Sequence, residues 1–378
     1  MTLTNNQNIL AFLRNHQREM VDLLTRLIEL ESPTNHKTSV DKLSTFLAKE
    51  LRHLGASVQA IPQTLAGDHV LARWGEGVGG ILLLCHMDTV WDIGTVAERP
   101  VRIESGRLYG PGAEDMKGGI VVGLWSIRAL RELGLFTKPV TLLLTSDEET
   151  GSATSRAIIE AEARKHQRVY VLEPAEPPHG SLKTRRKGVG EYRISVTGRA
   201  AHAGADHAKG INAIEELARQ ILTIQGFTDY ASGTTFNVGL VGGGTRTNVV
   251  PAEAWAEIDV RVVTSGETAR VEAQMQSLRT HLPGATLQIT GGFDRPPMER
   301  TPEIAALFAK AQSLAAGMGI RLTEAGTGGA SDGNFTAALG VPTLDGMGVV
   351  GDGGHSVDEY AVISSLPERA ALLAAMLA

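Results

Sequence analysis

The strongest constraint on the fold is a series of short apolar runs of strand type, each ending in acidic or histidine residues. ILLL precedes His86, VTLLLTS precedes the acids at 147–149, and VYVL precedes Glu173. Segments with helical spacing, over residues 115–133 and 153–165, alternate with these runs. Such alternation favours a mixed or parallel sheet flanked by helices. Ligands of such sheets gather at the carboxyl ends of the strands.

Towards the N-terminus, apolar residues recur at helical spacing over residues 8–30. This spacing predicts one amphipathic helix there and a second one over residues 40–54. Strands are expected at residues 57–61, 70–73 and 80–85.

Composition changes after Glu173, where residues 173–188 are rich in proline, glycine and charge and are expected to form a linker. The elements expected next have the order β-α-β-β-α-β, at residues 189–196, 212–224, 235–241, 254–262, 267–278 and 286–289. This order is typical of a ferredoxin-like α+β sandwich. A second hinge, DRPP at 294–297, follows it. We therefore expect a discontinuous domain of residues 1–185 and 296–378, with an inserted domain of residues 186–295.

Bulk properties agree with two domains and exclude some functions. A chain of 378 residues exceeds the size at which one core stops growing. Its net charge of −6, with scattered lysines and arginines, argues against a nucleic-acid partner.

The lone cysteine, Cys85, follows an apolar run and is expected to be a buried structural thiol. A single cysteine excludes an internal disulfide and fits a reducing compartment. Because the N-terminal segment shows no signal-peptide or membrane-span pattern, the expected location is cytoplasmic, with no membrane partner.

Several residues of metal-ligand type stand at strand ends or in glycine-rich loops, and each alone has an ordinary alternative. His86 could be a satisfied histidine, with Asp88 as a candidate partner of its second ring nitrogen. Asp115, in GPGAEDMKGG, could cap a helix. Glu173 could be a solvated strand end, and His355 an exposed loop histidine.

The adjacent acids Asp147, Glu148 and Glu149 read as a solvated turn, or as carboxylates whose repulsion a cation relieves. Two histidines and three or four acids could converge on one edge of the sheet. Imidazoles and carboxylates without a thiolate suit zinc, cobalt or manganese. Five or more ligands are too many for one tetrahedral zinc ion and suit two ions that share a carboxylate.

The segments HMDTVWDIGT, GPGAEDMKGG, TSDEETGS, VLEP, RAAHAG, TNVVPAEAWAEIDVRV, TGGASDGN and GGHSVDE resemble, in kind and order, the M20 family of dinuclear zinc metallopeptidases. Within that family the chain looks most like the glutamate carboxypeptidase subgroup. The resemblance implies a phosphorylase/hydrolase-like catalytic domain and an inserted lid through which the protein forms a homodimer. It also implies two Zn²⁺ ions, with Co²⁺ or Mn²⁺ as substitutes.

Carried over residue by residue, the resemblance implies five metal ligands: His86, Asp115, Glu149, Glu173 and His355. Asp115 would bridge the two ions and would be followed by a cis peptide bond. Glu148 would be the general base that activates a water between the ions, and Asp88 would orient His86.

The inserted domain supplies further candidates. The resemblance implies that His202, in RAAHAG, stabilises the oxyanion, in its own subunit or in a neighbouring one. The candidate substrate-binding residues are Asn248, Arg261, Arg295, Gly328 and Gly329. Ordinary alternatives for the first two are a turn asparagine and an edge-strand arginine.

One position departs from the family pattern. Glu114 precedes the bridging Asp115, where an uncharged residue is expected. This extra acid either points away from the ions or alters their affinity.

The leading hypothesis is a zinc exopeptidase that removes a C-terminal amino acid, with glutamate as the expected residue, from peptides or N-acyl amino acids. A close alternative is an N-acyl-amino-acid deacylase resembling acetylornithine deacetylase or desuccinylase. A third is a metal-dependent binding protein without turnover, which the presence of Glu148 disfavours. The loop at 110–119 lacks the G-x-G-x-x-G pattern of dinucleotide sites.

Overall fold

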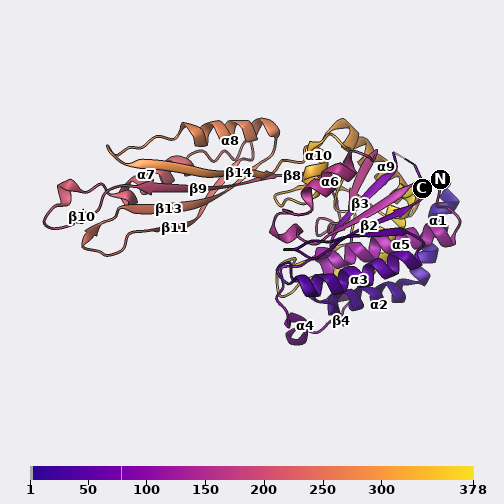
Figure 1. Ribbon diagram of the computed structural model, residues 1–378. Helices are drawn as coiled ribbons and strands as arrows, with labels where there is room; N and C mark the ends of the chain where they lie inside the picture. The colour runs from indigo at the N-terminus through magenta and orange to yellow at the C-terminus, as the bar shows by residue number, and fades with distance from the viewer. Residues whose placement is uncertain (1–2, 78) are drawn as a thin grey trace. The chain divides into compact units, whose positions relative to one another are not determined.

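The computed structural model describes residues 3–77 and 79–378 (Figure 1). The chain forms two compact units. Unit 1 runs from the N-terminal helices to Arg185 and resumes over Arg300–Thr327 and Ser331–Ala378. Unit 2 comprises Arg186–Glu299 and Gly328–Ala330.

Unit 1 is built on a six-stranded sheet with the strand order β1-β2-β6-β3-β7-β16. The strands are β1 (Ser57–Ile61), β2 (His69–Trp74), β6 (Val140–Thr145), β3 (Ile81–His86), β7 (Arg168–Val171) and β16 (Thr343–Leu344). Strands β6, β3, β7 and β16 pair in parallel, and β1 and β2 are antiparallel. The predicted mixed sheet is therefore confirmed.

Helices cover both faces of this sheet because successive side chains of its strands point to opposite faces. Leu83 and Cys85 of β3 lie in one apolar cluster with side chains from the helices α1 (Leu3–Asn15), α2 (Gln17–Glu29), α3 (Lys37–His53), α5 (Gly119–Glu132), α9 (Pro302–Gly317) and α11 (Ser365–Leu377). Leu82 and Leu84 lie in a second cluster, with α6 (Arg156–Ala163) and α10 (Gly333–Ala338). Cys85 is buried, as expected.

Two local expectations need correction. The single helix expected over residues 8–30 is two helices, because α1 and α2 meet at His16, whose backbone is not helical. The His16 ring nitrogen Nδ1 lies 2.8 Å from the Phe12 carbonyl oxygen, a group left over at the end of α1. The expected linker at 173–188 contains β8 (Leu182–Arg186), which pairs with β15 (Glu324–Thr327) and buries Leu182.

A small second sheet in unit 1 carries two loops that matter for the site. Its strand order is β17-β18-β5-β4. The strands are β17 (Gly351–Asp352), β18 (Tyr360–Val362), β5 (Arg107–Tyr109) and β4 (Arg102–Glu104). Because β5 pairs with β18, the segment after β5 and the segment before β18 start side by side.

Unit 2 has the element order β9 (Gly188–Thr197), α7 (Ala213–Gln225), β11 (Thr235–Gly243), β13 (Glu253–Val262), α8 (Ser265–Ser277) and β14 (Thr286–Arg295). It also contains a short pair of strands, β10 (Ala201–His202) and β12 (Val249–Val250). The sheet order is β11-β13-β9-β14, and all of its pairs are antiparallel. Side chains of α7 and α8 share one apolar cluster with alternate residues of the strands. This is the β-α-β-β-α-β sandwich that the sequence predicts.

Within residues 3–77 and 79–378, no helix is both long and apolar enough to cross a membrane.

Candidate metal centre

Three of the five expected ligands come from neighbouring parallel strands of unit 1. His86 is the last residue of β3, Glu149 lies in the turn after β6, and Glu173 follows β7 by two residues. His86 pairs in register with Thr145, the last residue of β6. The carboxyl ends of these strands therefore place all three side chains at one edge of the sheet.

Asp115 reaches this edge from the irregular segment Ala113–Gly118, which leads into α5. The Asp115–Met116 peptide bond is cis, which confirms the expectation from the sequence. A Cβ atom on Gly119 would overlap the carbonyl oxygen of Leu172, so only glycine lets α5 begin against the end of β7. This close approach carries Asp115 towards Glu173.

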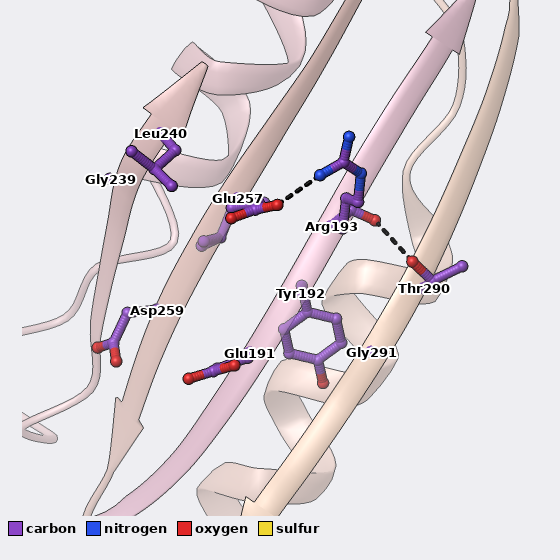
Figure 2. Close-up of a pocket in the computed structure, with 10 residues that line it drawn as sticks. Glu191, Tyr192, Arg193, Gly239, Leu240, Glu257, Asp259, Thr290 and Gly291 are labelled. Atoms are coloured by element: carbon purple, nitrogen blue, oxygen red, sulfur yellow. Dashed lines mark hydrogen bonds and ion pairs between the residues drawn. The ribbon is translucent and has the colours of Figure 1, made fainter. Parts of the chain in front are cut away.

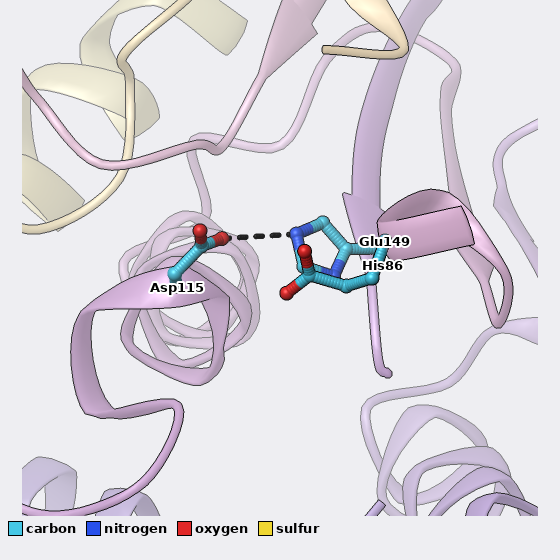
Figure 3. Close-up of side chains that lie close together, drawn as sticks. All are labelled: His86, Asp115 and Glu149. Atoms are coloured by element: carbon cyan, nitrogen blue, oxygen red, sulfur yellow. Dashed lines mark hydrogen bonds and ion pairs between the residues drawn. The ribbon is translucent and has the colours of Figure 1, made fainter. Parts of the chain in front are cut away.

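The ligand side chains form two groups that meet at Asp115. His86 Nε2 lies 3.0 Å from Asp115 Oδ1 (Figure 3) and 3.4 Å from Glu173 Oε1. His355 Nε2, from the loop between β17 and β18, lies 3.4 Å from Asp115 Oδ2 and 3.1 Å from Glu149 Oε2. The two oxygens of one carboxylate thus face two different imidazoles, as a bridging ligand requires.

The donor set fits a pair of divalent metal ions. Ligand atoms of His86, Asp115 and Glu149 lie within 4.8 Å of one another. Glu149 Oε1 is buried and has no hydrogen-bond partner among the described residues. A buried carboxylate oxygen without a partner is costly. A cation at this position would stabilise it, and imidazole with carboxylate is a donor set that zinc and related metals accept.

The carboxylates of this cluster raise the pKa values of both histidines. Burial alone would lower the pKa of His86, but hydrogen bonds that its ring donates to the carboxylates of Asp115, Asp88 and Glu173 raise the pKa well above its usual value. Hydrogen bonds with Asp115 and Glu149 raise the pKa of His355 to about 10. Burial raises the pKa of Glu149. Metal ions would therefore compete with protons for the imidazole nitrogens.

Asp88 is fully buried, and its carboxylate supports the turn after β6 more directly than it supports His86. Its oxygens accept hydrogen bonds from the backbone N–H groups of Glu148 at 3.3 Å and Glu149 at 3.2 Å. The Thr34 hydroxyl donates to it at 2.8 Å. His86 Nδ1 lies 3.0 Å from the backbone oxygen of Asp88 but 3.5 Å from its carboxylate.

The remaining acids of this region are also accounted for. Asp147 Oδ2 accepts hydrogen bonds from the backbone N–H of Thr154 at 2.6 Å and from its hydroxyl at 2.8 Å, so this acid fixes the far side of the turn. Glu148, the expected general base, is half-buried next to Glu149. Glu114 is buried and accepts from the Gly354 N–H at 3.0 Å. Burial, then the charges of Asp115 and Glu359, raise the pKa of Glu114 to about 8.

Two supporting residues were missed from the sequence. Glu359 is buried and binds the backbone on either side of Glu114, and Thr34 binds Asp88. The acid that closes the GGHSVDE segment was the available signal for Glu359. Nothing in the sequence near Thr34 points to the site.

In unit 2, two of the expected substrate-site residues lie on paired segments. His202 ends β10, which pairs with β12 (Val249–Val250), and the Ala203 N–H donates to the Asn248 carbonyl oxygen at 3.0 Å. His202 Nδ1 accepts from the N–H groups of Gly204 at 3.1 Å and Ala205 at 3.0 Å. In the neutral ring the hydrogen is therefore on Nε2, which leaves Nε2 as a donor.

The other candidates in unit 2 are partly engaged. Arg261 forms a forked ion pair with the Asp259 carboxylate, with Nη2–Oδ2 at 2.7 Å and Nε–Oδ1 at 2.9 Å. Arg295 is buried at the end of β14. Gly328 and Gly329 are exposed, and the Gly329 carbonyl oxygen accepts from Arg186 Nη1 at 3.2 Å.

A shallow hollow lies on the face of the unit 2 sheet opposite α7 and α8. Its charged lining comes from β9 and β13 and includes an ion pair between Arg193 and Glu257 (Figure 2). Glu191 and Asp259 make this surface predominantly acidic. It contains none of the clustered metal-ligand residues.

Residues 82–378 match the peptidase family M20/M25/M40. The chain belongs to this family. Carboxypeptidase G2 of Pseudomonas sp. (strain RS-16) is 31% identical over 361 residues, which cover 93% of this chain and 87% of the relative. The acetylornithine deacetylase of Edwardsiella ictaluri (strain 93-146) is 34% identical over 241 residues, or 59% of this chain and 61% of the relative.

Solved structures share the fold. Aminopeptidase PepT of Bacillus cereus ATCC 10987 has a TM-score of 0.80 at 22% identity, covering 96% of this chain and 98% of that one. The YXEP protein of Bacillus subtilis, described as a dinuclear metal-binding peptidase of family M20, has a TM-score of 0.71 at 15% identity, covering 96% and 98%. Family membership confirms the predicted class, a metallopeptidase-type hydrolase of amide bonds.

Proposed function

We propose that the protein is a dinuclear zinc exopeptidase that hydrolyses the amide bond to a C-terminal amino acid, with glutamate as the leading candidate. The observation that carries the proposal is the position of Asp115, whose two oxygens face His86 and His355. The full-length similarity to carboxypeptidase G2 supports the substrate class.

When bound, two divalent ions would supply an acidified water and a polarised substrate carbonyl group. Glu148 accepts the proton of the attacking water and delivers it to the leaving amine. The turn fixed by Asp88 and Asp147 carries both Glu149, the proposed ligand, and Glu148, the proposed proton acceptor.

His202 is the proposed oxyanion donor. Because its Nδ1 accepts two backbone hydrogen bonds, its Nε2–H is oriented by the protein before substrate binds. A donor fixed in advance stabilises developing charge without reorganisation.

For the substrate carboxylate, we propose Arg261 and Asn248, assisted by Arg295 and by the backbone N–H groups of Gly328 and Gly329. The fork of Arg261 matches a carboxylate and already holds that of Asp259. The substrate must therefore share or displace this internal partner, which favours substrates with a strong anionic end.

We also propose a homodimer formed through unit 2. The edge strand β11 carries two exposed apolar side chains, Leu240 and Val241. Pairing of such an edge with a second copy would cover these groups. The lone buried Cys85 supports the cytoplasmic location as part of the same proposal.

The test is hydrolysis of N-acyl amino acids and dipeptides that vary in the C-terminal residue, by metal-free, zinc-loaded and cobalt-loaded protein. We expect turnover only with metal and highest kcat/KM for C-terminal glutamate. Glu148→Ala should keep both ions and lose activity by about 10²–10⁴-fold or more. A metal-replete Glu148→Ala protein with near-normal turnover would contradict the assignment.

The second candidate, deacylation of N-acyl amino acids, is favoured by the similarity to acetylornithine deacetylase. In the same panel, activity that depends on a short acyl group and tolerates basic C-terminal residues would favour the deacylase function over the carboxypeptidase function. Tight binding of panel members by the zinc-loaded protein without any turnover would select the binding-protein alternative.

A further inference from the structure

Two loops of unit 1 each carry one metal ligand and one additional buried carboxylate. The segment 110–118 contains Asp115 and Glu114, and the segment 351–359 contains His355 and Glu359. The extra carboxylates have none of the metal-binding, catalytic or substrate-binding roles proposed above.

Glu359, from the second loop, binds the backbone of the first. Its side chain is almost fully buried, at 1% exposure. Oε1 accepts from the N–H groups of Glu114 at 2.9 Å and Asp115 at 3.1 Å. Oε2 accepts from the Gly112 N–H at 2.9 Å and from Trp91 Nε1 at 3.0 Å. Four donors thus converge on one carboxylate, and one of them belongs to the bridging ligand.

Glu114, from the first loop, binds the backbone of the second. Its Oε2 accepts from the N–H of Gly354, the residue before His355, at 3.0 Å. A Cβ atom on Gly351 would lie 3.0 Å from Glu114 Cγ, so the loop also packs tightly against this side chain. Each loop therefore holds the other through a carboxylate that accepts backbone hydrogen bonds.

His355 needs such support. Its side chain is 55% exposed, so packing does little to fix it. Its φ angle of 63° is left-handed, a conformation that is unfavourable for a residue with a side chain. A loop of this kind holds one conformation only when its surroundings determine it.

We propose that Glu114 and Glu359 are positioning residues that form a reciprocal clasp and fix the separation between Asp115 and His355. The clasp prepares the metal position shared by Asp115, Glu149 and His355 before any ion binds. The inference rests on the proposed metal pair, not on the identity of the substrate. It also assigns a use to Glu114, the acid that departs from the family pattern.

The test measures zinc affinity directly, by two-site competition with a chromophoric chelator in the absence of substrate. Glu114→Ala releases the Gly354 N–H, and we expect one of the two zinc ions to bind about 10–100-fold more weakly while the other is retained. Glu114→Gln keeps an amide oxygen for the same N–H and should restore most of this affinity. Glu359→Gln turns an NH₂ group towards two of four N–H donors and should weaken zinc binding at least as much as Glu114→Ala.

The matched control is Glu216→Gln in unit 2. Glu216 is also fully buried, and its carboxylate also accepts from loop N–H groups, those of His281 and Leu282, but no metal ligand lies on that loop. We expect wild-type zinc affinity for this variant. Hydrogen exchange of the metal-free proteins should be faster at 351–359 in Glu114→Ala than in wild type, and unchanged there in Glu216→Gln.

Wild-type affinity for both ions in Glu114→Ala would overturn the clasp, as would an equal loss in Glu114→Gln or in Glu216→Gln. If Glu359→Gln does not fold, the Glu114 pair decides the question alone. A wild-type protein that binds two zinc ions but hydrolyses no substrate refutes the proposed function and leaves the clasp intact. If the wild-type protein is fully active and Glu114→Ala binds zinc as wild type does, the clasp is refuted and the proposed function stands.

Discussion

Asp88→Asn separates two ways in which a buried acid can serve this site. The carboxylate accepts from the Glu148 N–H, the Glu149 N–H and the Thr34 hydroxyl, while the backbone oxygen of Asp88 faces His86 Nδ1. Replacing the carboxylate by an amide leaves this backbone oxygen in place. The substitution should therefore disturb the turn that carries Glu148 and spare the orientation of His86.

The magnitude follows from counting donors. Asparagine offers one oxygen, and its NH₂ group must point at one of the two backbone N–H groups. The Thr34 hydroxyl can rotate to accept from that NH₂ group. One buried N–H then loses its acceptor, at a cost of about 1–3 kcal/mol. For a unit of this size that corresponds to a fall in Tm of about 2–12 °C.

Asp88→Asn should have a larger effect on kcat than on the free energy of unfolding. A displacement of the catalytic group by about 1 Å can cost about 10²-fold in rate. We expect kcat to fall by about that factor, with KM and the affinity for both zinc ions little changed. Stability is measured on metal-free protein by urea unfolding, so that loss of metal does not contribute to the difference.

The matched control is Thr34→Val, which removes the hydroxyl donor but leaves both N–H groups paired with Asp88. It should cost about 0.5–1.5 kcal/mol and leave kcat near normal. If Asp88→Asn instead weakened zinc binding and kept kcat in the zinc-saturated enzyme, the carboxylate would act through His86 and the reasoning above would be wrong.

Three further predictions concern unit 1, which carries the site. Burial lowers the pKa of His166 below its usual value of 6.5, so the stability it contributes is present above pH 6.5 and is lost as pH falls. His166→Gln should flatten the loss of unfolding free energy between pH 7 and 5 in metal-free protein; an unchanged slope would contradict this. Gly119→Ala should lower metal content and stability, although alanine favours helices by about 1 kcal/mol, because its Cβ would meet the Leu172 carbonyl; a rise in Tm would refute that contact. Chelation should speed hydrogen exchange at 147–152 more than at the buried strand β3, and equal protection with and without zinc would show that the ions do not hold this turn.

Much of the fold follows from local patterns. The strands β3, β6 and β7 are apolar throughout because both faces of the sheet are covered, and that pattern is readable in the sequence. The break at His16 was not readable, since apolar spacing continues through it. The strand β8 was missed because its residues LKTRR are mostly polar, although four of the five are buried.

The site divides in the same way. His86, Glu149 and Glu173 were found because each follows an apolar strand. The supporting residues Thr34, which binds Asp88, and Glu359, which binds the backbone at Asp115, were not found, because they act through hydrogen bonds between distant segments. Asp88 binds the turn with its carboxylate and faces His86 with its backbone oxygen. This division depends on the folded geometry and cannot be read from the residue pattern.

The order of the ligands along the chain has a consequence for how the protein is made. His86 is synthesised early, and His355, which completes the second half of the cluster, is synthesised near the end. Most of unit 2 lies between them as one continuous segment, so it can fold on the ribosome while the metal ligands are still incomplete. The nascent chain is thereby kept from closing a metal pair until the catalytic unit has received its last loop.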